Sequence, residues 1–421
     1  MRSDNNPIFL DLFAGAGGLS EGFIRAGFCP IAHIEADQAA CFTLRTRMAY
    51  HWLKTHGRVE QYDDYLLGNV SRSFLYSLVP VHCINSVINS EISKESLPEL
   101  FRKTDELLNG AKLDLIIGGP PCQAYSIVGR SRDKNRMKGD RRNYLYVYYA
   151  EFLNRYRPLW FVFENVTGLL SAKDENGNLY FDSMRRLFRD AGYETEFMTL
   201  AAEEYGVLQS RQRIILVGKL GKGTGFFPEP VKWHTNVMVY EVFRDLPPLQ
   251  AGQGDFGPCR TKKYTGSYLY DACIRNDSLS VTWHQARPNR DHDLEIYRIV
   301  VELWNKKKNR LNYNQLPDRL KTHRHRNSFL DRFKVVAGDL QFSHTVVAHI
   351  AKDGHYYIHP DIEQNRSLTP REVARIQTFP DDYFFESVSG IPHRTPAFRQ
   401  IGNAVPVLLA QRIAEKLKEV L

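Results

Sequence analysis

The sequence predicts an α/β fold: a doubly wound, mostly parallel sheet with a second, smaller domain that is rich in loops. Short apolar runs alternate with helix-like stretches over the first two thirds of the 421 residues. Most of these runs are continuous, which is typical of strands that are buried on both faces. From about residue 221 to 253, Gly, Pro and Trp interrupt the pattern, and this change indicates a domain boundary.

The individual elements follow from the spacing of the apolar residues. The apolar runs predict strands at Ile8–Phe13, Pro30–Ile34, Leu113–Ile117, Leu159–Phe163, Glu194–Leu200 and Arg213–Val217. Helical spacing predicts helices at Leu19–Ala26, Tyr144–Tyr156 and Ser183–Ala191. The stretch from Phe42 to Lys112 contains helix-like pieces that the pattern does not assign.

Two more helices are predicted near the C-terminus. Thr369-Pro-Arg-Glu372 has the pattern of a capping box with proline at the first helical position, and this helix should end before Pro380. Val405–Val420 is amphipathic, with an apolar stripe of Leu408, Leu409, Ile413, Leu417 and Val420. We expect residues 1–225 to form one domain that is completed by 385–421, and residues 226–384 to form the other.

The composition excludes several classes of protein. Hydrophobic residues at 43% and charged residues at 25% are ordinary globular values. The longest apolar runs fall short of the roughly 18 residues of a membrane span, and Asn5, Asn6 and Pro7 stand where a signal peptide would be apolar. The six cysteines form no CxxC pair, which argues against a zinc site or a disulfide framework. We expect a cytoplasmic protein with free thiols and no metal site.

The positive charge is concentrated in two windows. Residues 130–142 contain seven Lys or Arg against two acids, and residues 301–340 contain ten against four. The windows sum to +11, more than the +8 of the whole chain, so the remainder is close to neutral. Concentrated positive charge favours a polyanion partner, because phosphates release counterions when Lys or Arg bind them. The alternative is a pair of solvated basic loops.

A glycine-rich turn follows the first predicted strand. In Asp11-Leu-Phe-Ala-Gly-Ala-Gly-Gly18 the turn opens a helix, where free backbone N–H groups favour a polar or anionic ligand. A dinucleotide fingerprint would need glycine at position 20, where this chain has Ser20. Glu35 ends the second strand and is placed to accept hydrogen bonds from both hydroxyls of a ribose. The alternative is a turn selected only for tight packing.

Three further segments place reactive side chains at strand ends. Cys122, in Gly118-Gly-Pro-Pro-Cys-Gln-Ala-Tyr-Ser126, follows a buried strand and lies beside the first basic window, which would favour its thiolate. Glu164 ends another buried run, where it could exchange a proton with a ring nitrogen or merely cap a helix. Gln209-Ser-Arg-Gln-Arg213 begins a third strand with Arg211 and Arg213 on alternate positions, hence on one face.

Taken in order, these motifs resemble those of the DNA (cytosine-5)-methyltransferases, especially the bacterial modification enzymes. The resemblance runs through Asp11–Gly18, Glu35, Gly119-Pro-Pro-Cys-Gln123, Asn143–Leu145, Glu164-Asn-Val166, Gln209–Arg213, Arg366–Tyr383 and Gln400-Ile-Gly-Asn-Ala-Val-Pro406. It implies a Rossmann-like fold, with 1–225 and 385–421 as the catalytic and cofactor-binding domain. Residues 226–384 would then be the target recognition domain.

The resemblance also implies S-adenosyl-L-methionine as methyl donor and a flipped-out cytosine as acceptor. Cys122 would attack C6, Glu164 would act on N3, and Arg213, with Arg211 beside it, would contact O2. The cofactor would be bound by Phe13, Ala14, Gly15, Gly17, Gly18, Leu19, Glu35, Ala36, Pro120, Leu145, Asn403 and Ala404. Where the family has Asp-Ile or Asp-Leu at the adenine, the nearest match is Glu91-Ile92.

The implied partner is double-stranded DNA, bound by a chain expected to be a monomer. The residues expected at the DNA are Gln123, Ser126, Arg130, Arg132, Lys306, Lys307, Lys308, Arg324 and Arg326. An endonuclease acting on the same site is an expected partner if the chain belongs to a restriction-modification system. A tRNA cytosine-5 methyltransferase is the alternative function, although a recognition region of about a hundred residues favours reading several base pairs. A flavin or NAD enzyme is disfavoured by Ser20 and by the Pro-Pro-Cys-Gln motif.

Overall fold

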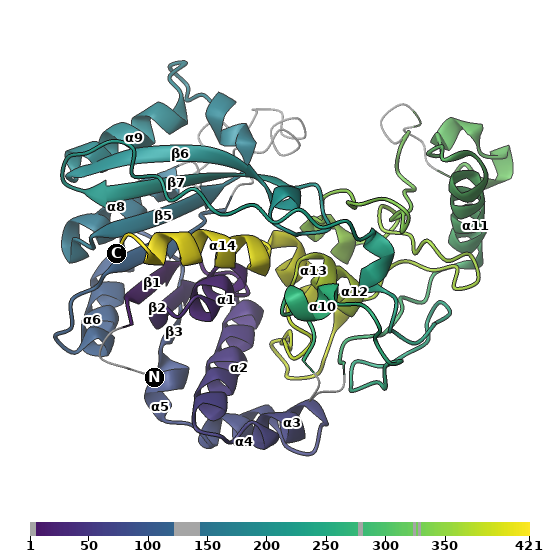
Figure 1. Cartoon of the computed structure of the whole chain (residues 1–421), viewed down its shortest axis with the longest axis horizontal. Coiled ribbons are helices and arrows are strands. Elements are labelled where there is room, and N and C mark those ends of the chain that lie inside the picture. Colours follow the sequence, from purple (N-terminus) through teal and green to yellow (C-terminus); the bar gives the residue numbers. More distant parts are fainter. Residues whose placement is uncertain (1–5, 122–143, 277–280, 323–325, 327–329) are drawn as a thin grey trace.

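The computed structural model describes residues 6–121, 144–276, 281–322, 326 and 330–421, and it contains one seven-stranded sheet (Figure 1). The strand order is β3-β2-β1-β4-β5-β7-β6. The strands are β1 Ile8–Leu12, β2 Cys29–Glu35, β3 Val87–Asn89, β4 Leu115–Gly118, β5 Trp160–Asn165, β6 Tyr193–Ala201 and β7 Gln212–Leu220. Neighbouring strands are parallel except at β7, which is antiparallel to both β5 and β6. The predicted α/β class and the mostly parallel sheet are therefore confirmed.

The predicted strands are found with ends that differ by a few residues, and the sheet contains one strand more. This strand, β3, has three residues and is too short to stand out as an apolar run. Every residue of β1, β4 and β5 is buried, as predicted from continuous apolar runs. β6 lies at the sheet edge, and only Tyr193, Thr195 and Leu200 of its nine residues are buried.

Helices cover both faces of the sheet. One core cluster joins alternate residues of β1, β4, β5 and β7 to α1 and α14, and the other joins the intervening residues to α6, α8 and α9. The helices are α1 Gly18–Arg25, α2 Gln38–Thr55, α3 Glu60–Leu66, α4 Arg72–Ser77, α5 Val81–Asn85, α6 Leu97–Leu108, α8 Leu145–Tyr156, α9 Tyr180–Asp190, α10 Tyr268–Asp271, α11 Asp291–Lys307, α12 Pro370–Ile376, α13 Arg394–Asn403 and α14 Val407–Lys418. The stretch from Phe42 to Lys112 thus contributes most of α2 and all of α3 to α6.

The two C-terminal helices have the predicted signals. Thr369 and Glu372 form both bonds of the capping box at α12, and the helix ends at Ile376. In α14 the residues Leu408, Leu409, Ile413 and Leu417 are buried. Val420 lies beyond the end of the helix and is 47% exposed, so its assignment to the apolar stripe was wrong.

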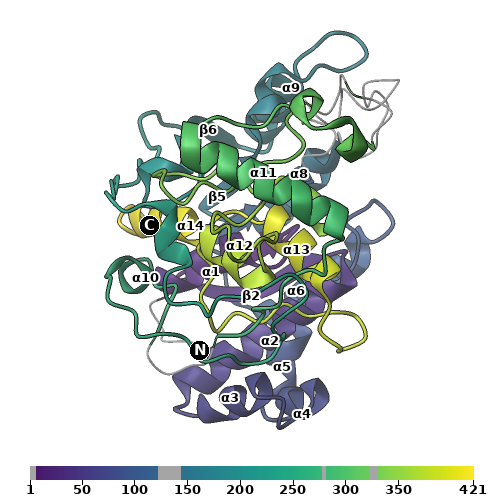
Figure 2. The ribbon, with the colours of Figure 1, turned by 90° about the vertical axis from the view of Figure 1, so that its right-hand side faces the viewer.

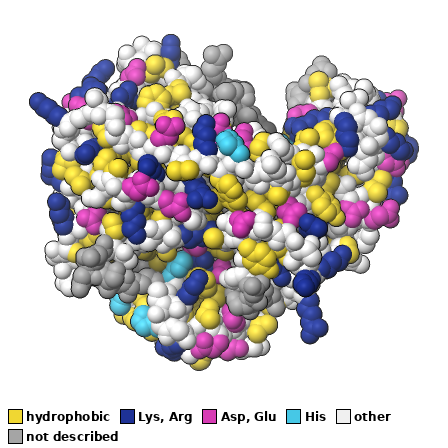
Figure 3. Space-filling view, in the orientation of Figure 1, with side chains coloured by type: hydrophobic (Ala, Val, Ile, Leu, Met, Phe, Trp, Pro, Cys, Tyr) yellow, Lys and Arg dark blue, Asp and Glu magenta, His cyan; other side chains and the backbone are white. Residues whose placement is uncertain are grey.

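The second lobe, around α11, has a core of its own within the expected domain of residues 226–384. Its core cluster joins α11 to residues between Leu311 and Ile358. The main core with α1 and α14 contains residues 368–385 and also Val239, Tyr268, Trp283, Val336, Val346, Ile350 and Tyr357. The apolar side chains of residues 226–384 are therefore divided between two cores. Figure 1 shows α11 set apart from the sheet, Figure 2 shows it from the front, and the molecular surface is hollowed between the lobes (Figure 3).

Candidate active site

The carboxyl ends of the parallel strands gather the predicted site at one edge of the sheet. β1 leads into the glycine-rich turn, β2 ends at Glu35, and β4 leads into Gly119-Pro120. β5 ends with Glu164 and Asn165, and antiparallel β7 begins at the same edge, since Asn165 pairs with Ile214. This edge is where open α/β sheets bind their ligands.

The turn after β1 has an uncommon backbone. Phe13 has φ of +58°, in the left-handed region that non-glycine residues seldom adopt, and Gly15 and Gly17 follow at +55° and +81°. A Cβ on Gly17 would approach the Tyr383 hydroxyl to 2.8 Å, and one on Gly18 would approach the Val405 carbonyl to 2.4 Å. The turn is thus held closely against the segment that follows α13.

Glu35 supports this turn directly. One carboxylate oxygen accepts the Gly15 N–H at 2.7 Å, and the other accepts the Asp37 N–H at 2.7 Å. Burial raises the pKa of Glu35, and these backbone hydrogen bonds oppose the rise. Each carboxylate oxygen keeps a lone pair for another donor, so the residue has acceptors for two hydroxyl groups.

Asp11 lies on β1 below the turn and is 1% exposed. Its Oδ2 atom has no hydrogen-bond partner among the described residues. Burial and the nearby charge of Glu35 raise its pKa well above the usual value for an aspartate. A buried acceptor without a partner is uncommon in proteins and indicates a place for a ligand donor or an ordered water.

The other predicted cofactor residues lie around this turn to differing degrees. Asn403, the last residue of α13, is exposed, and Ala404 lies against Gly18. Glu91 is exposed two residues beyond Asn89, which pairs with Glu35 between β3 and β2. Ile92 instead belongs to the core under the sheet. Leu145 is the first residue of α8, and its place at the cofactor stays a prediction.

Glu164 and Arg213 form an ion pair at the centre of the edge. Arg213 Nε lies 2.8 Å from Glu164 Oε1, and each side chain is 12% exposed. Burial raises the pKa of Glu164, and the charges of Arg213 and Arg211 oppose this rise only in part. A Cβ on Gly119 would lie 2.7 Å from Glu164 Oε2, so only glycine lets the backbone before Cys122 pass this carboxyl group.

Asn165 joins the two catalytic segments and was not among the predicted site residues. Its side-chain amide donates to the Pro120 carbonyl at 3.2 Å, and its carbonyl oxygen accepts the Val166 N–H at 2.9 Å. The residue is 1% exposed. Asn165 thus ties the loop that leads to Cys122 to the end of β5. Its one signal in the sequence is its position next to Glu164 in Glu164-Asn-Val166.

Arg211 lies just before β7, which begins at Gln212. It is 2% exposed, and its guanidinium donates to the carbonyls of Val346 at 2.6 Å and Ala404 at 2.9 Å. Arg211 therefore binds the backbone at Val346 and Ala404, and its charge also acts on the carboxyl group of Glu164.

The structure places only some of the residues expected at DNA. Cys122, Gln123, Ser126, Arg130, Arg132 and Arg324 lie outside the described residues. In the second lobe Lys306 pairs with Glu302 at 3.1 Å and Lys308 pairs with Asp339. Lys307 and Arg326 are exposed. Two of the three lysines at the end of α11 thus already have acidic partners.

Metal sites and membrane spans are both absent from the part of the chain that the structure describes. No group of three His, Cys, Asp or Glu side chains there could hold a metal ion. None of the described helices combines the length and the apolar character needed to cross a membrane.

Comparison with known proteins gives consistent matches over nearly the whole chain. The model of the family "C-5 cytosine-specific DNA methylase" matches residues 8–69 and 88–419. Type II methyltransferase M.Bpa9945I of Bacillus paralicheniformis is 40% identical, over 98% of this chain and 99% of its own length. Type II methyltransferase M.DdeI of Desulfomicrobium norvegicum is 29% identical, over 97% and 88%. A solved structure of a protein encoded within an E. coli prophage is similar in fold, with a TM-score of 0.62, 22% identity and coverage of 98% and 99%.

Proposed function

The chain belongs to the C-5 cytosine-specific DNA methylases, and from this we propose that it methylates a flipped-out cytosine within a specific duplex sequence, with S-adenosyl-L-methionine as donor. The relatives that carry the name type II methyltransferase support a role as the modification enzyme of a restriction-modification system. The observation that carries the proposal is the buried Glu164–Arg213 pair beside Gly119. The family is one of DNA methylases, which favours DNA over the alternative tRNA substrate.

The residues at the glycine-rich turn fit the proposed cofactor. Glu35 has acceptors for the two ribose hydroxyls, and Asp11 Oδ2 is a buried acceptor that lacks a partner among the described residues. The turn itself is held open by the backbone of Phe13, Gly15 and Gly17. When bound, S-adenosyl-L-methionine supplies an electrophilic methyl group. Phe13, Glu35 and Asn403 are the residues we expect to hold it.

Glu164 and Arg213 are arranged to bind one edge of a cytosine ring. N3 and O2 belong to adjacent ring positions, and the two side chains are themselves neighbours at 2.8 Å. With N3 at the carboxyl group, O2 is placed toward the guanidinium. The raised pKa of Glu164 keeps a proton available for N3 in a pocket with little water.

Cys122 follows Pro121 directly, and we propose that its thiolate attacks C6 of the cytosine. The new S–C6 bond pushes the electron pair of the C5–C6 double bond through the ring toward N3, where Glu164 delivers its proton. C5 becomes nucleophilic and is methylated. Loss of the C5 proton to a base, and return of the N3 proton to Glu164, then expel the thiolate and restore the ring.

A base-resolution methylation map of host DNA after expression of the chain tests this function. We expect 5-methylcytosine at one short sequence, and none in cells expressing Cys122→Ala. Duplex DNA with 5-fluorocytosine at that site should form a covalent adduct with the parent chain, because fluorine blocks the final elimination. A map without new 5-methylcytosine, or undiminished adduct formation by Cys122→Ala, would contradict the proposal.

A further inference from the structure

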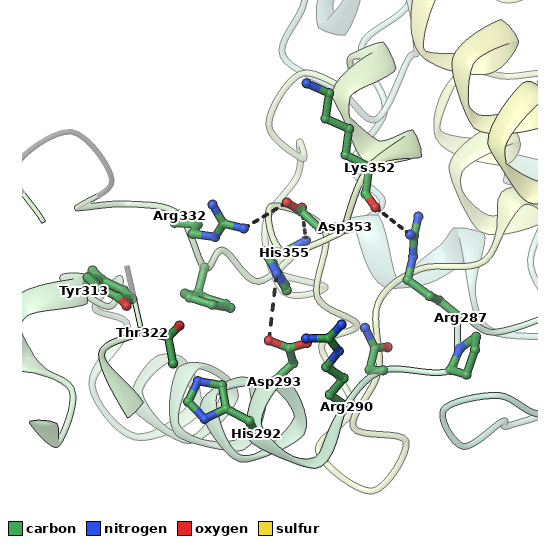
Figure 4. Close-up of a pocket in the computed structure, with 13 residues that line it drawn as sticks. Arg287, Arg290, His292, Asp293, Tyr313, Thr322, Arg332, Lys352, Asp353 and His355 are labelled. Atoms are coloured by element: carbon green, nitrogen blue, oxygen red, sulfur yellow. Dashed lines mark hydrogen bonds and ion pairs between the residues drawn. The ribbon is translucent and has the colours of Figure 1, made fainter. Parts of the chain in front are cut away.

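A second cavity lies in the recognition lobe, at the first turn of α11 (Figure 4). Its volume is about 370 Å³, which is ample for a phosphate group with part of its sugar. The charged side chains that line it are Arg287, Arg290, Arg332, Lys352, Asp293 and Asp353. None of these residues was singled out by the sequence.

The charges around this cavity do not balance. Four cations face two acids, which leaves an excess of two positive charges when the histidines are neutral. One of the two acids is already paired, since Arg332 lies 3.1 Å from Asp353. Among the described residues Arg290 and Lys352 have no ion-pair partner, and both are exposed. An anion in the cavity would offset this excess.

Arg287 adds a positive charge to the cavity and donates its hydrogen bonds to backbone carbonyls, not to an acidic side chain. Its two terminal nitrogens donate to the carbonyls of Lys352 and Ile350, both at 2.9 Å. Burial lowers its pKa, and the neighbouring charge of Arg394 adds to this. Its Nε is a buried atom without a partner among the described residues, and so is Nε2 of His292, which also lines the cavity. Two unpaired nitrogens in one basic cavity fit an oxygen-rich anion.

The N-terminus of α11 also favours an anion in this cavity. Arg290 is the N-cap residue of this 17-residue helix and forms no side-chain capping bond, so the first backbone N–H groups of the helix remain available to an acceptor. A long helix favours negative charge at this end. Here the helix terminus adds to the cavity and its charges.

The cavity lies at the root of the lobe, next to the main body. Its wall at Lys352 continues from the 3₁₀ helix η9, Ala348–Ala351, which packs so closely on α13 that a Cβ on Gly402 would lie 2.4 Å from Ala348 N. Arg394, the first residue of α13, donates to Gln285 near Arg287. A duplex bound between the lobes would lie near this junction.

We propose that this cavity binds a backbone phosphate of the duplex DNA and so anchors the duplex independently of its sequence. The inference rests on the proposed function, because it takes duplex DNA as the ligand. The same chemistry would suit a free phosphate compound, and the test separates the two sources.

The test compares two double variants that remove the same charge. Arg290→Gln/Lys352→Gln changes the cavity, and Lys94→Gln/Lys222→Gln changes two exposed lysines of the catalytic domain. The dissociation constant for duplex DNA is measured at several salt concentrations. We expect the slope of log K against log salt to flatten by about 0.9 for one lost phosphate contact in the cavity variant only. The methylated sequence should stay the same.

The second arm titrates inorganic phosphate and dAMP into the parent chain at constant ionic strength. We expect no saturable binding of either at submillimolar concentration. An unchanged salt slope in the cavity variant would overturn the proposal, and saturable dAMP binding that this variant abolishes would reassign the cavity to a free nucleotide. If the parent chain binds DNA but methylates no cytosine, the proposed function is contradicted. The salt dependence of DNA binding would still test whether the cavity binds a phosphate.

Discussion

Two buried charge clusters in this molecule differ in how completely their charges are matched. Between Arg366 and Asp382 the side chains of Arg366, Arg371 and Arg375 are 0% exposed, and each makes several hydrogen bonds. Among the described residues, the ion-pair partner of Glu164 at the sheet edge is Arg213, and the backbone of Gly119 lies close to its other oxygen. The charges of the first cluster are matched by acidic partners and carbonyls, whereas Glu164 pairs through one oxygen.

The pKa values of the two key carboxyl groups move in opposite directions for this reason. Burial opposes the ionised form of Glu372, but two hydrogen bonds from Arg366 at 2.7 and 2.8 Å outweigh it and hold its pKa well below the usual range. Burial raises the pKa of Glu164, and Arg213 only partly reverses the rise. We expect charge in the first cluster to stabilise the fold, and charge in the second to support the proposed proton exchange. Both clusters lie in segments with recognisable motifs, so a motif alone does not tell these roles apart.

The largest expected effect comes from breaking the satisfied cluster. Arg366→Met leaves Glu372 buried without its guanidinium, which should lower the free energy of unfolding by about 3–5 kcal/mol. Urea unfolding at neutral pH measures this loss. Arg102→Met is the matched control, because Arg102 pairs with Glu99 on the exposed face of α6, and it should leave stability nearly unchanged. Equal, small losses in both variants would remove the distinction between the clusters.

A smaller effect should follow from crowding Glu164. Gly119→Ala places a Cβ 2.7 Å from Glu164 Oε2 and must displace either the carboxyl group or the loop before Cys122. We expect the single-turnover rate to fall by about 10- to 100-fold, with stability little changed. Gly257→Ala, whose Cβ would keep an ordinary 3.4 Å contact, serves as control. An unimpaired Gly119→Ala rate would show that the spacing between this loop and Glu164 is not needed.

These distinctions could be predicted from the sequence only in part. Continuous apolar runs predicted β1, β4 and β5, and the capping box predicted α12, because both signals are local. β3 was missed since three residues do not make a pattern. The core of the second lobe joins α11 to segments that lack a period, so the sequence pattern did not reveal which side chains form it.

The position of a site residue could be predicted where that residue lies at the end of a predicted strand. Glu35 and Glu164 lie at the expected edge because parallel strands place their carboxyl ends together. The contact of Asn165 with Pro120 depends on two loops that meet only in the folded chain. The contacts of Arg211 with Val346 and Ala404 were not visible because these partners are distant in sequence. Spacing alone gave Arg211 and Arg213 the same role.

The smallest effect is a dependence on pH. Because its folded pKa is raised, Glu164 keeps its proton at a higher pH than in the unfolded chain. The single-turnover rate should therefore fall as pH rises through that value, and stability should decline over the same interval, since the unfolded chain binds fewer protons there. A rate profile measured with saturating DNA and cofactor checks this. If the rate of Glu164→Gln falls over the same pH interval as the rate of the parent chain, a titratable group other than Glu164 causes the fall.

The most direct test of the central claim, that Glu164 exchanges a proton with the substrate ring, is the single-turnover methylation rate of Glu164→Gln. Glutamine keeps the size and can donate a hydrogen bond, but it cannot deliver a proton to N3. We expect a loss on the order of 10²-fold or more in this rate, with dissociation constants for DNA and cofactor and the unfolding free energy close to those of the parent. A Gln variant with an unimpaired single-turnover rate would leave Glu164 only a structural role and would exclude proton exchange with the ring.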